Sequence, residues 1–232
     1  MSIPTASRVY FDICRVLYDD RKCFIHFPST QDDWDKVVEG FKLIAGFDRV
    51  VGAVDGTLIK RSRPTNFWGW YCRKNFPAYS MQAVVDSNKL FLEFLVRPGS
   101  CNDNTLWSGS WIGANVKRVI PYNHHLLGDG GYMLREYLLT PFEHDARSTP
   151  EINKYNLVHS RRRISVECAF GALKGRFQIL RHELESHSEQ VDATVIGACV
   201  VLHNFCILHD KKSLTLWIQL CLMKNAQMKN AI

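Results

Sequence analysis

Residues 50–56 have the sequence VVGAVDG, a mostly apolar run that is followed by aspartate and glycine. A short continuous apolar run that ends in a turn signal is typical of a buried strand. The same order of residue types returns in the sequence LLGDGG at residues 126–131. We therefore expect two buried strands, with Asp55 at the carboxyl end of the first and Asp129 after the second.

The segments around these two strands predict an α/β fold. Residues 80–85 and 90–96 are two further strand-like runs, and the turn residues 86–89 between them predict an antiparallel hairpin. Helices are expected at residues 2–17, after an N-cap at Ser29-Thr30, around Leu106, Trp107 and Trp111, at residues 148–180, and at residues 188–208. This order matches a ribonuclease-H-like fold, a mixed sheet with an antiparallel hairpin that is flanked by helices.

The composition is that of a folded protein with a modest positive charge. The chain has 232 residues, of which 46% are hydrophobic, and a formal net charge of +6. This charge is compatible with a polyanionic partner, but many enzymes carry as much. The eight cysteines form no close CxxC pair, and residues 195–208, the longest apolar run, are interrupted by His203 and Asn204. We expect a reduced, intracellular protein without a membrane span.

Three carboxylates are the candidate catalytic residues: Asp55, Asp129 and Glu167. Hydrolysis of a phosphodiester can use two divalent ions about 3.5–4 Å apart, and Mg²⁺ prefers carboxylate oxygens. Glu167 falls on a helical stripe that is offset by about 100° from the apolar stripe of the same helix. Basic residues of this helix are the candidate DNA contacts: Arg161, Arg162, Arg163 and Lys174.

Simpler interpretations of the same residues stay open at this point. An Asp-Gly pair after a strand is usually only turn chemistry, and the arginine triplet 161–163 is more often a solvated helix face than a phosphate clamp. A second metal site is also conceivable, because Cys199, His203, Cys206 and His209 recur at helical spacing. A single helix cannot surround Zn²⁺ tetrahedrally, so we favour a buried helix with an internally hydrogen-bonded histidine.

Seven sequence blocks, in order along about 160 residues, resemble the harbinger-type DDE transposases. They are VGAVDGT at 51–57, YCRKN at 71–75, QAVVD at 82–86, PGSCND at 98–103, LGDGGY at 127–132, VECAFGALK at 166–174 and VLHNF at 201–205. In that family the positions that match Asp55, Asp129 and Glu167 are the metal-binding catalytic triad. The position of Asp103 matches a recurrent aspartate, which we interpret as a possible support residue.

The resemblance implies a DDE-type transposase or endonuclease that cuts DNA with two Mg²⁺ or Mn²⁺ ions and possibly transfers strands. It also implies a nuclear protein, a separate Myb-like DNA-binding partner from the same element, and possible homo-oligomers. Two departures are visible: Leu58 stands where the family often has histidine, and residues 1–46 resemble only the tail of a helix-turn-helix region plus a linker helix. The nuclease domain is expected at residues 47–210 and an irregular tail at 211–232. The alternative function is a domesticated or decayed relative that binds DNA or protein without cleavage.

Overall fold

The computed structural model describes residues 3–45, 48–65, 68–143, 149–186 and 188–209. These residues form two compact units. Those up to His26 and those from Leu184 onward form the first unit, and Phe27–Glu183 form the second. The predicted irregular tail, 211–232, lies outside the described residues. All the candidate catalytic residues lie in the second unit.

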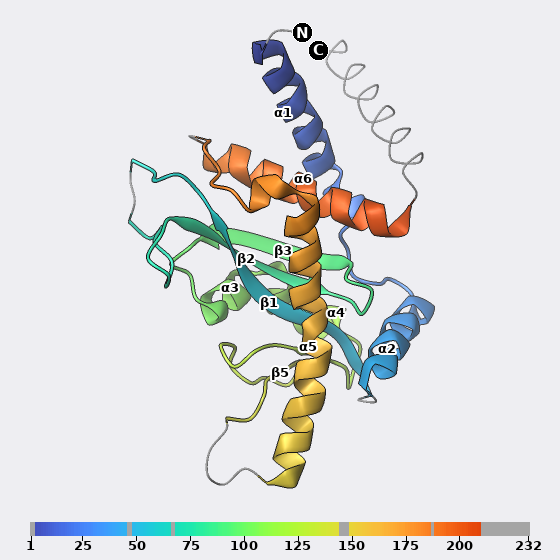
Figure 1. Cartoon of the computed structure of the whole chain (residues 1–232). Helices are drawn as coiled ribbons and strands as arrows, with labels where there is room; N and C mark the ends of the chain where they lie inside the picture. The colour runs from blue at the N-terminus through green and yellow to red at the C-terminus, as the bar shows by residue number, and fades with distance from the viewer. Residues whose placement is uncertain (1–2, 46–47, 66–67, 144–148, 187, 210–232) are drawn as a thin grey trace. The chain divides into compact units, whose positions relative to one another are not determined.

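The second unit is built on a five-stranded mixed sheet (Figure 1). Its strands are β1 (Val50–Lys60), β2 (Ala78–Val85), β3 (Phe91–Pro98), β4 (His125–Leu127) and β5 (Leu138–Leu139). Their order across the sheet is β3-β2-β1-β4-β5, with antiparallel pairing among β1, β2 and β3 and parallel pairing among β1, β4 and β5. The predicted ribonuclease-H-like architecture with its antiparallel hairpin is therefore confirmed. The two-residue strand β5 was not predicted.

The hairpin turn between β2 and β3 is stabilised by one aspartate. The Oδ1 atom of Asp86 accepts hydrogen bonds from the backbone N–H groups of Asn88, at 2.9 Å, and Leu90, at 2.8 Å. Lys89 takes the left-handed conformation that closes the turn, with φ of 70°. The turn chemistry expected at residues 86–89 is therefore present.

Asp55 lies inside β1, which corrects the prediction that it ends the strand. The parallel pairing with β4 covers only Val50, Gly52 and Ala53, whereas the antiparallel pairing with β2 runs from Ala53 to Lys60. The long antiparallel partner keeps β1 extended through the Asp-Gly pair, which by itself favours a turn. Asp55 therefore lies beyond the last paired residue on the β4 side of the strand.

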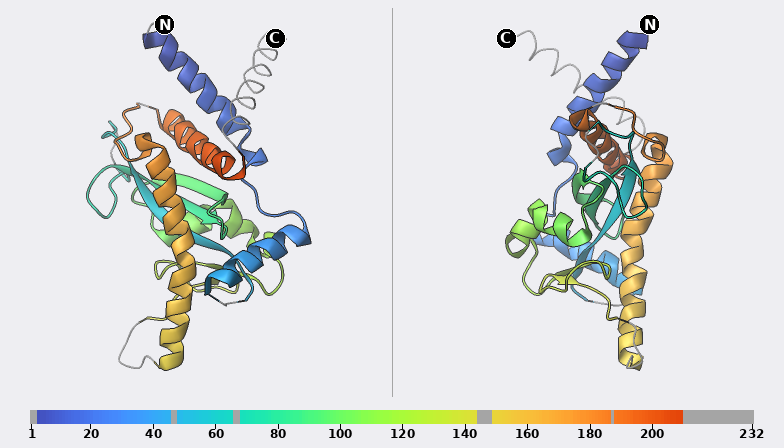
Figure 2. Two further views of the ribbon diagram at one scale, coloured as in Figure 1. Left: turned by 45° about the vertical axis from the view of Figure 1, so that its right-hand side comes forward. Right: turned by 90° about the vertical axis from the view of Figure 1, so that its left-hand side faces the viewer.

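Helices cover both faces of this sheet (Figure 2). Helix α5 (Pro150–Arg176) lies along one face and contacts β1 and β2. Helices α3 (Asp103–Gly109) and α4 (Trp111–Val119) lie on the other face. Helix α2 (Gln31–Ala45) packs against β1 and α5. These layers bury the apolar strands on both sides, with Asp55 inside β1 and Asp129 just after β4.

The predicted helix around Leu106, Trp107 and Trp111 is two helices. The backbone N–H of Ser110 bonds to the carbonyl of Trp107 and ends α3. The hydroxyl of Ser110 accepts the N–H of Gly113 at 2.9 Å and thereby begins α4. Ser110 is the N-cap of α4, so Trp111 belongs to a new helix axis and is 51% exposed. Leu106 and Trp107 are buried as expected.

Helix α5 binds the sheet differently along its two halves. In the first half, Asn156 pairs with both backbone groups of Phe142, and the ring of His159 lies 3.1 Å from the carbonyl oxygen of Leu139. These bonds stabilise the short edge strand β5, which has little pairing of its own. In the second half, an apolar stripe is buried against the sheet: Val166, Phe170 and Leu173, with Leu180 in the following 3-10 turn.

The first unit pairs the two ends of the described chain. Helix α1 (Ile3–Asp19) packs against α6 (Glu189–Leu208), and the rings of Phe24 and Phe205 are 5.7 Å apart. The side-chain amide of Asn204 donates to the carbonyl of Phe24 at 2.8 Å. Helix α6 thus belongs to the same compact unit as α1, and the domain bounds at residues 47 and 210 stay a prediction.

Helix α6 is buried as predicted from its apolar sequence. It is long and apolar enough to cross a membrane by length and composition, but more than half of its most apolar window is buried inside the protein. Cys199 and His203 are also buried, whereas Cys206 is exposed. Within the described ranges, no three His, Cys, Asp or Glu side chains are grouped to hold a metal ion. The structure therefore gives no support to a zinc site on α6.

Candidate active site

The centre of the site is an arginine of α5 that joins two of the candidate carboxylates. The Nη1 atom of Arg163 lies 2.6 Å from Oδ2 of Asp55 on β1, and Nη2 forms an ion pair with Oε1 of Glu167. Arg163 and Glu167 are four residues apart on α5, so their side chains leave the same face of the helix. Asp55 and Arg163 are 17% and 20% exposed, whereas Glu167 is 49% exposed. The site is therefore closed on the sheet side and open to solvent at Glu167.

The electrostatic environment of Asp55 includes the other two candidate carboxylates. The pKa of Asp55 is raised to about 6, mainly by burial, and the negative charges of Asp129 and Glu167 act in the same direction. The Gly56 N–H, which donates to Oδ1 of Asp55 at 2.7 Å, and the Arg163 guanidinium act against this increase in pKa. Both carboxylate oxygens of Asp55 therefore accept hydrogen bonds, and the negative charges of Asp129 and Glu167 act on this carboxylate.

Asp129 lies in a short loop after β4 that α3 holds in place. Its Oδ1 atom accepts the N–H of Gly131 at 2.9 Å. The side chain of Asn104 on α3 donates to the carbonyl of Gly131 at 3.0 Å and accepts the N–H of Met133 at 2.8 Å. Asn104 thus binds the loop on both sides of Tyr132. No local sequence signal connects Asn104 with this loop, because the contact spans 27 residues.

Asp103 adds a fourth carboxylate next to Asp129. A side chain at Gly131 would begin 2.4 Å from Oδ2 of Asp103 and 3.0 Å from Oδ1 of Asp129, so only glycine allows these two carboxylates to approach there. Oδ1 of Asp103 would likewise lie 3.1 Å from a side chain at Gly56. Burial and the negative charge of Asp129 raise the pKa of Asp103. The structure therefore places the predicted support residue beside Asp129, close to both Gly56 and Gly131.

A buried tyrosine lies behind the carboxylates. The hydroxyl of Tyr132 donates to Oε1 of Gln82 on β2 at 3.2 Å, and its ring packs edge-on against Trp107. Burial raises the pKa of Tyr132, and so do the carboxylates of Asp103, Asp55 and Asp129. Tyr132 is therefore a neutral hydrogen-bond donor. No sequence signal connects it with Gln82, because 50 residues separate them.

Lys174 is bound to the sheet, although the sequence suggested it as a phosphate contact. Its Nζ atom donates to Oγ1 of Thr57 and to the carbonyl oxygen of Leu58, both at 2.7 Å. Burial lowers its pKa to about 8, with smaller contributions from Lys74 and Arg181. Lys174 thus connects α5 to β1 two residues beyond Asp55. A phosphate contact by Lys174 stays a prediction.

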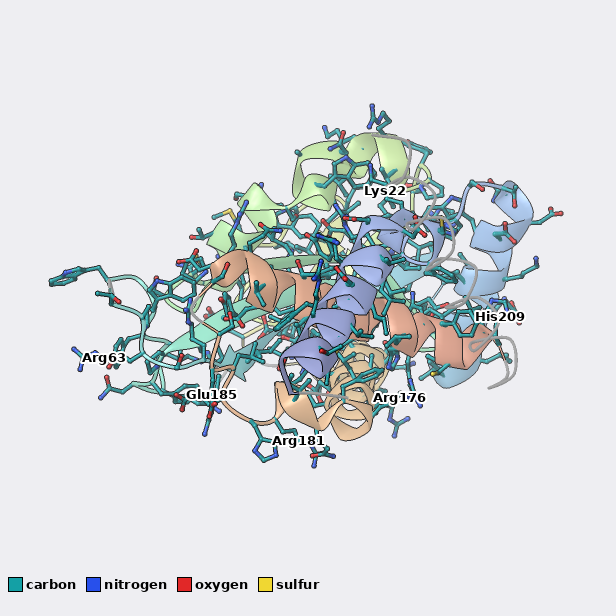
Figure 3. All side chains as sticks on the ribbon, turned by 90° about the horizontal axis from the view of Figure 1, so that it is seen from above. Lys22, Arg63, Arg176, Arg181, Glu185 and His209 are labelled. Carbon is teal, nitrogen blue, oxygen red and sulfur yellow. The ribbon has the colours of Figure 1, made fainter. Side chains whose placement is uncertain are left out.

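The other basic residues of the predicted DNA surface differ in exposure. Arg161 is exposed, whereas Arg162 is fully buried. Successive helix residues are rotated by about 100°, so Arg161 and Arg162 lie on different faces of α5, and a DNA contact by either residue stays a prediction. Arg176 and Arg181, at and beyond the end of α5, are exposed and extend outward (Figure 3). Beside Gly171 there is open space, as expected for an accessible helix face.

The hydrogen bonds of Lys174 to β1 predict that replacing this side chain lowers the free energy of unfolding. Lys174→Met keeps the apolar stem but removes both hydrogen bonds to β1, and the free energy of unfolding should fall by about 2 kcal/mol, the scale of charge-assisted hydrogen bonds. Urea unfolding measures this difference. Lys154→Met, an exposed site on the same helix, is the matched control and should change stability little. Equal stabilities of the two variants would contradict this role of Lys174.

Comparison with known proteins identifies the family of this chain. The model of the DDE superfamily endonuclease family matches residues 54–204, a range that contains all three candidate carboxylates. The chain is 26% identical over 213 residues to the Bos taurus protein named "Putative nuclease HARBI1", and 27% identical over 208 residues to "Protein ALP1-like" of Arabidopsis thaliana. These matches cover 90% and 82% of this chain but 60% and 51% of the relatives. No solved structure matches the chain. The chain belongs to the DDE superfamily endonuclease family.

Proposed function

We propose that this chain is a DNA endonuclease of the transposase type, in which Asp55, Asp129 and Glu167 hold divalent metal ions. The observation that carries the proposal is the shared electrostatic environment of these side chains. Asp55 on β1, Asp129 after β4 and Glu167 on α5 come from three separate elements, and both partners raise the pKa of Asp55. Folding brings like charges together in this way at a stability cost, which a bound cation offsets.

The chemistry of the donors fits a hard divalent cation. All candidate ligands are carboxylate oxygens, which Mg²⁺ and Mn²⁺ prefer, and Glu167 is half exposed, so that water and phosphate could complete the coordination. The absence of a side chain at Gly131 lets the carboxylates of Asp103 and Asp129 approach each other. Two carboxylates in such an arrangement are also suited to a hard divalent cation. When bound, the metal would activate water and offset negative charge at the phosphate.

The protein residues have distinct tasks in this proposal. Asp55 is fixed by the rigid β1 strand and by the Gly56 N–H, and Asp129 is fixed by the loop that Asn104 holds. The preorganised carboxylates orient the reacting groups, which is the main protein contribution to phosphoryl transfer. Exposed Arg161 on α5 supplies sequence-independent affinity for DNA phosphates. A nuclear location and a separate DNA-binding partner belong to the same proposal.

Glu167→Gln tests the proposed third ligand. The change keeps the side-chain size but removes the negative charge that a hard cation needs, and Glu167 is exposed enough that folding should survive. Cleavage of plasmid DNA with Mg²⁺ or Mn²⁺ should fall at least about a hundredfold, about 3 kcal/mol of transition-state stabilisation. Glu151→Gln makes the same change at an exposed site in the first turn of α5 and should leave cleavage unchanged.

Two outcomes would contradict the proposal in different ways. If Glu167→Gln cuts as fast as wild type, Glu167 is not a ligand, and Glu151 becomes the carboxylate to examine. If folded wild type binds Mn²⁺ and DNA but cuts no DNA, the chain is a binding protein that has lost cleavage.

The pKa of Asp55 predicts a pH dependence of metal binding. A proton and a metal ion compete for the same carboxylate, and burial raises the pKa of Asp55 to about 6. Above pH 7 the carboxylate is ionised and the affinity for Mn²⁺ should be nearly constant. Below pH 6 the apparent Kd should rise by about tenfold per pH unit, as a Mn²⁺ titration from pH 7.5 to 5 would show. A constant affinity over this range would exclude Asp55 as a ligand.

A further inference from the structure

The guanidinium of Arg163 lies between the carboxylates of Asp55 and Glu167, where a metal ion bound to both of them would also lie. Its two terminal nitrogens contact one carboxylate each, from two different elements of the fold. We propose that Arg163 is a built-in counter-cation of the metal site: it must release Asp55 and Glu167 before these carboxylates bind metal, and it thereby sets the affinity for metal. This inference rests on the proposed metal-dependent function of the same site.

The hydrogen bonds of Asp55 show why release is needed. Its Oδ1 accepts the backbone N–H of Gly56 at 2.7 Å, and its Oδ2 accepts Nη1 of Arg163 at 2.6 Å. The Gly56 N–H belongs to the paired strand β1 and cannot move away from Asp55 without disturbing the sheet. The arginine side chain has several rotatable bonds and can move. Of these two partners, Arg163 is therefore the one that a metal ion displaces.

The arrangement of Glu167 leads to the same conclusion. Its Oε1 is engaged by Nη2 of Arg163, one helical turn away on α5. A guanidinium and a divalent cation at the same carboxylate oxygens would repel each other, so the bound guanidinium weakens the binding of the metal ion. The open space beside Gly171, on the same helix face, and the exposure of Glu167 leave a route to solvent for the displaced side chain.

The state without metal also explains why a counter-cation is present. Asp55 is largely buried and lies near Asp129 and Glu167, so three negative charges would face one another without Arg163. Among the described residues no three such side chains are gathered closely enough to hold a metal ion. The bridge by Arg163 keeps Asp55 and Glu167 apart, because a guanidinium separates the oxygens that it joins.

Mn²⁺ titration of the protein without DNA, followed by electron paramagnetic resonance of free Mn²⁺, tests the inference. Arg163→Gln should bind Mn²⁺ at least tenfold more tightly than wild type. Its melting temperature should be lower than that of wild type without metal, and the increase on adding Mn²⁺ should be larger. Arg161→Gln removes the same charge from an exposed site two residues away and is the control for general charge effects.

Arg163→Lys separates competition from charge and retains the best chance of normal folding. It keeps the positive charge, but one ammonium cannot replace the two-pronged guanidinium contact. The inference therefore predicts an affinity for Mn²⁺ between those of wild type and Arg163→Gln. Both Arg163 variants binding Mn²⁺ no more tightly than wild type would overturn it, since Arg163 would then only connect α5 to β1. If neither wild type nor any variant binds Mn²⁺, the proposed function fails together with this inference.

Discussion

The ion pairs of Arg163 with Asp55 and Glu167 are the contact on which the arrangement of the site depends. The pair with Asp55 joins the long helix α5 to the central strand β1, beside the apolar side chains that are buried between them. Lys174 makes a second polar connection between the same elements, to Thr57 and Leu58. Burial of the apolar stripe supplies the stabilisation between α5 and the sheet, while these two cations determine which residues face each other.

The opposite side of the site is organised by hydrogen bonds from α3. Asn104 holds the loop that carries Asp129, and Gly131 leaves the room in which Asp103 and Asp129 approach each other. Asp55 and Glu167 therefore have the guanidinium of Arg163 between them. Asp103 and Asp129, in contrast, approach each other where Gly131 has no side chain. This asymmetry fits a site in which divalent ions complete the charge balance of the fold.

Local patterns predicted the strands, the hairpin and the long helix, because apolar periodicity and turn residues act over a few positions. Asp55 was expected at a strand end, yet pairing with β2 extends β1 to Lys60. Trp111 was assigned to the wrong helix, because Ser110 acts as a cap in the middle of the pattern. The burial of Arg162 and the contacts of Asn104, Tyr132 and Lys174 depend on tertiary neighbours up to 117 residues away. No local signal carries that information. The candidate triad came from family resemblance more than from spacing.

A crystal structure of the protein grown with Mn²⁺, with anomalous diffraction measured at the manganese edge, tests the central claim most directly. The account predicts an anomalous peak within bonding distance of Asp55 and Glu167, with the guanidinium of Arg163 moved away from both carboxylates. Asp129 should contribute an oxygen to the same ion or to a second one nearby. A peak elsewhere in the molecule, with Arg163 still paired to Asp55 and Glu167, would contradict it.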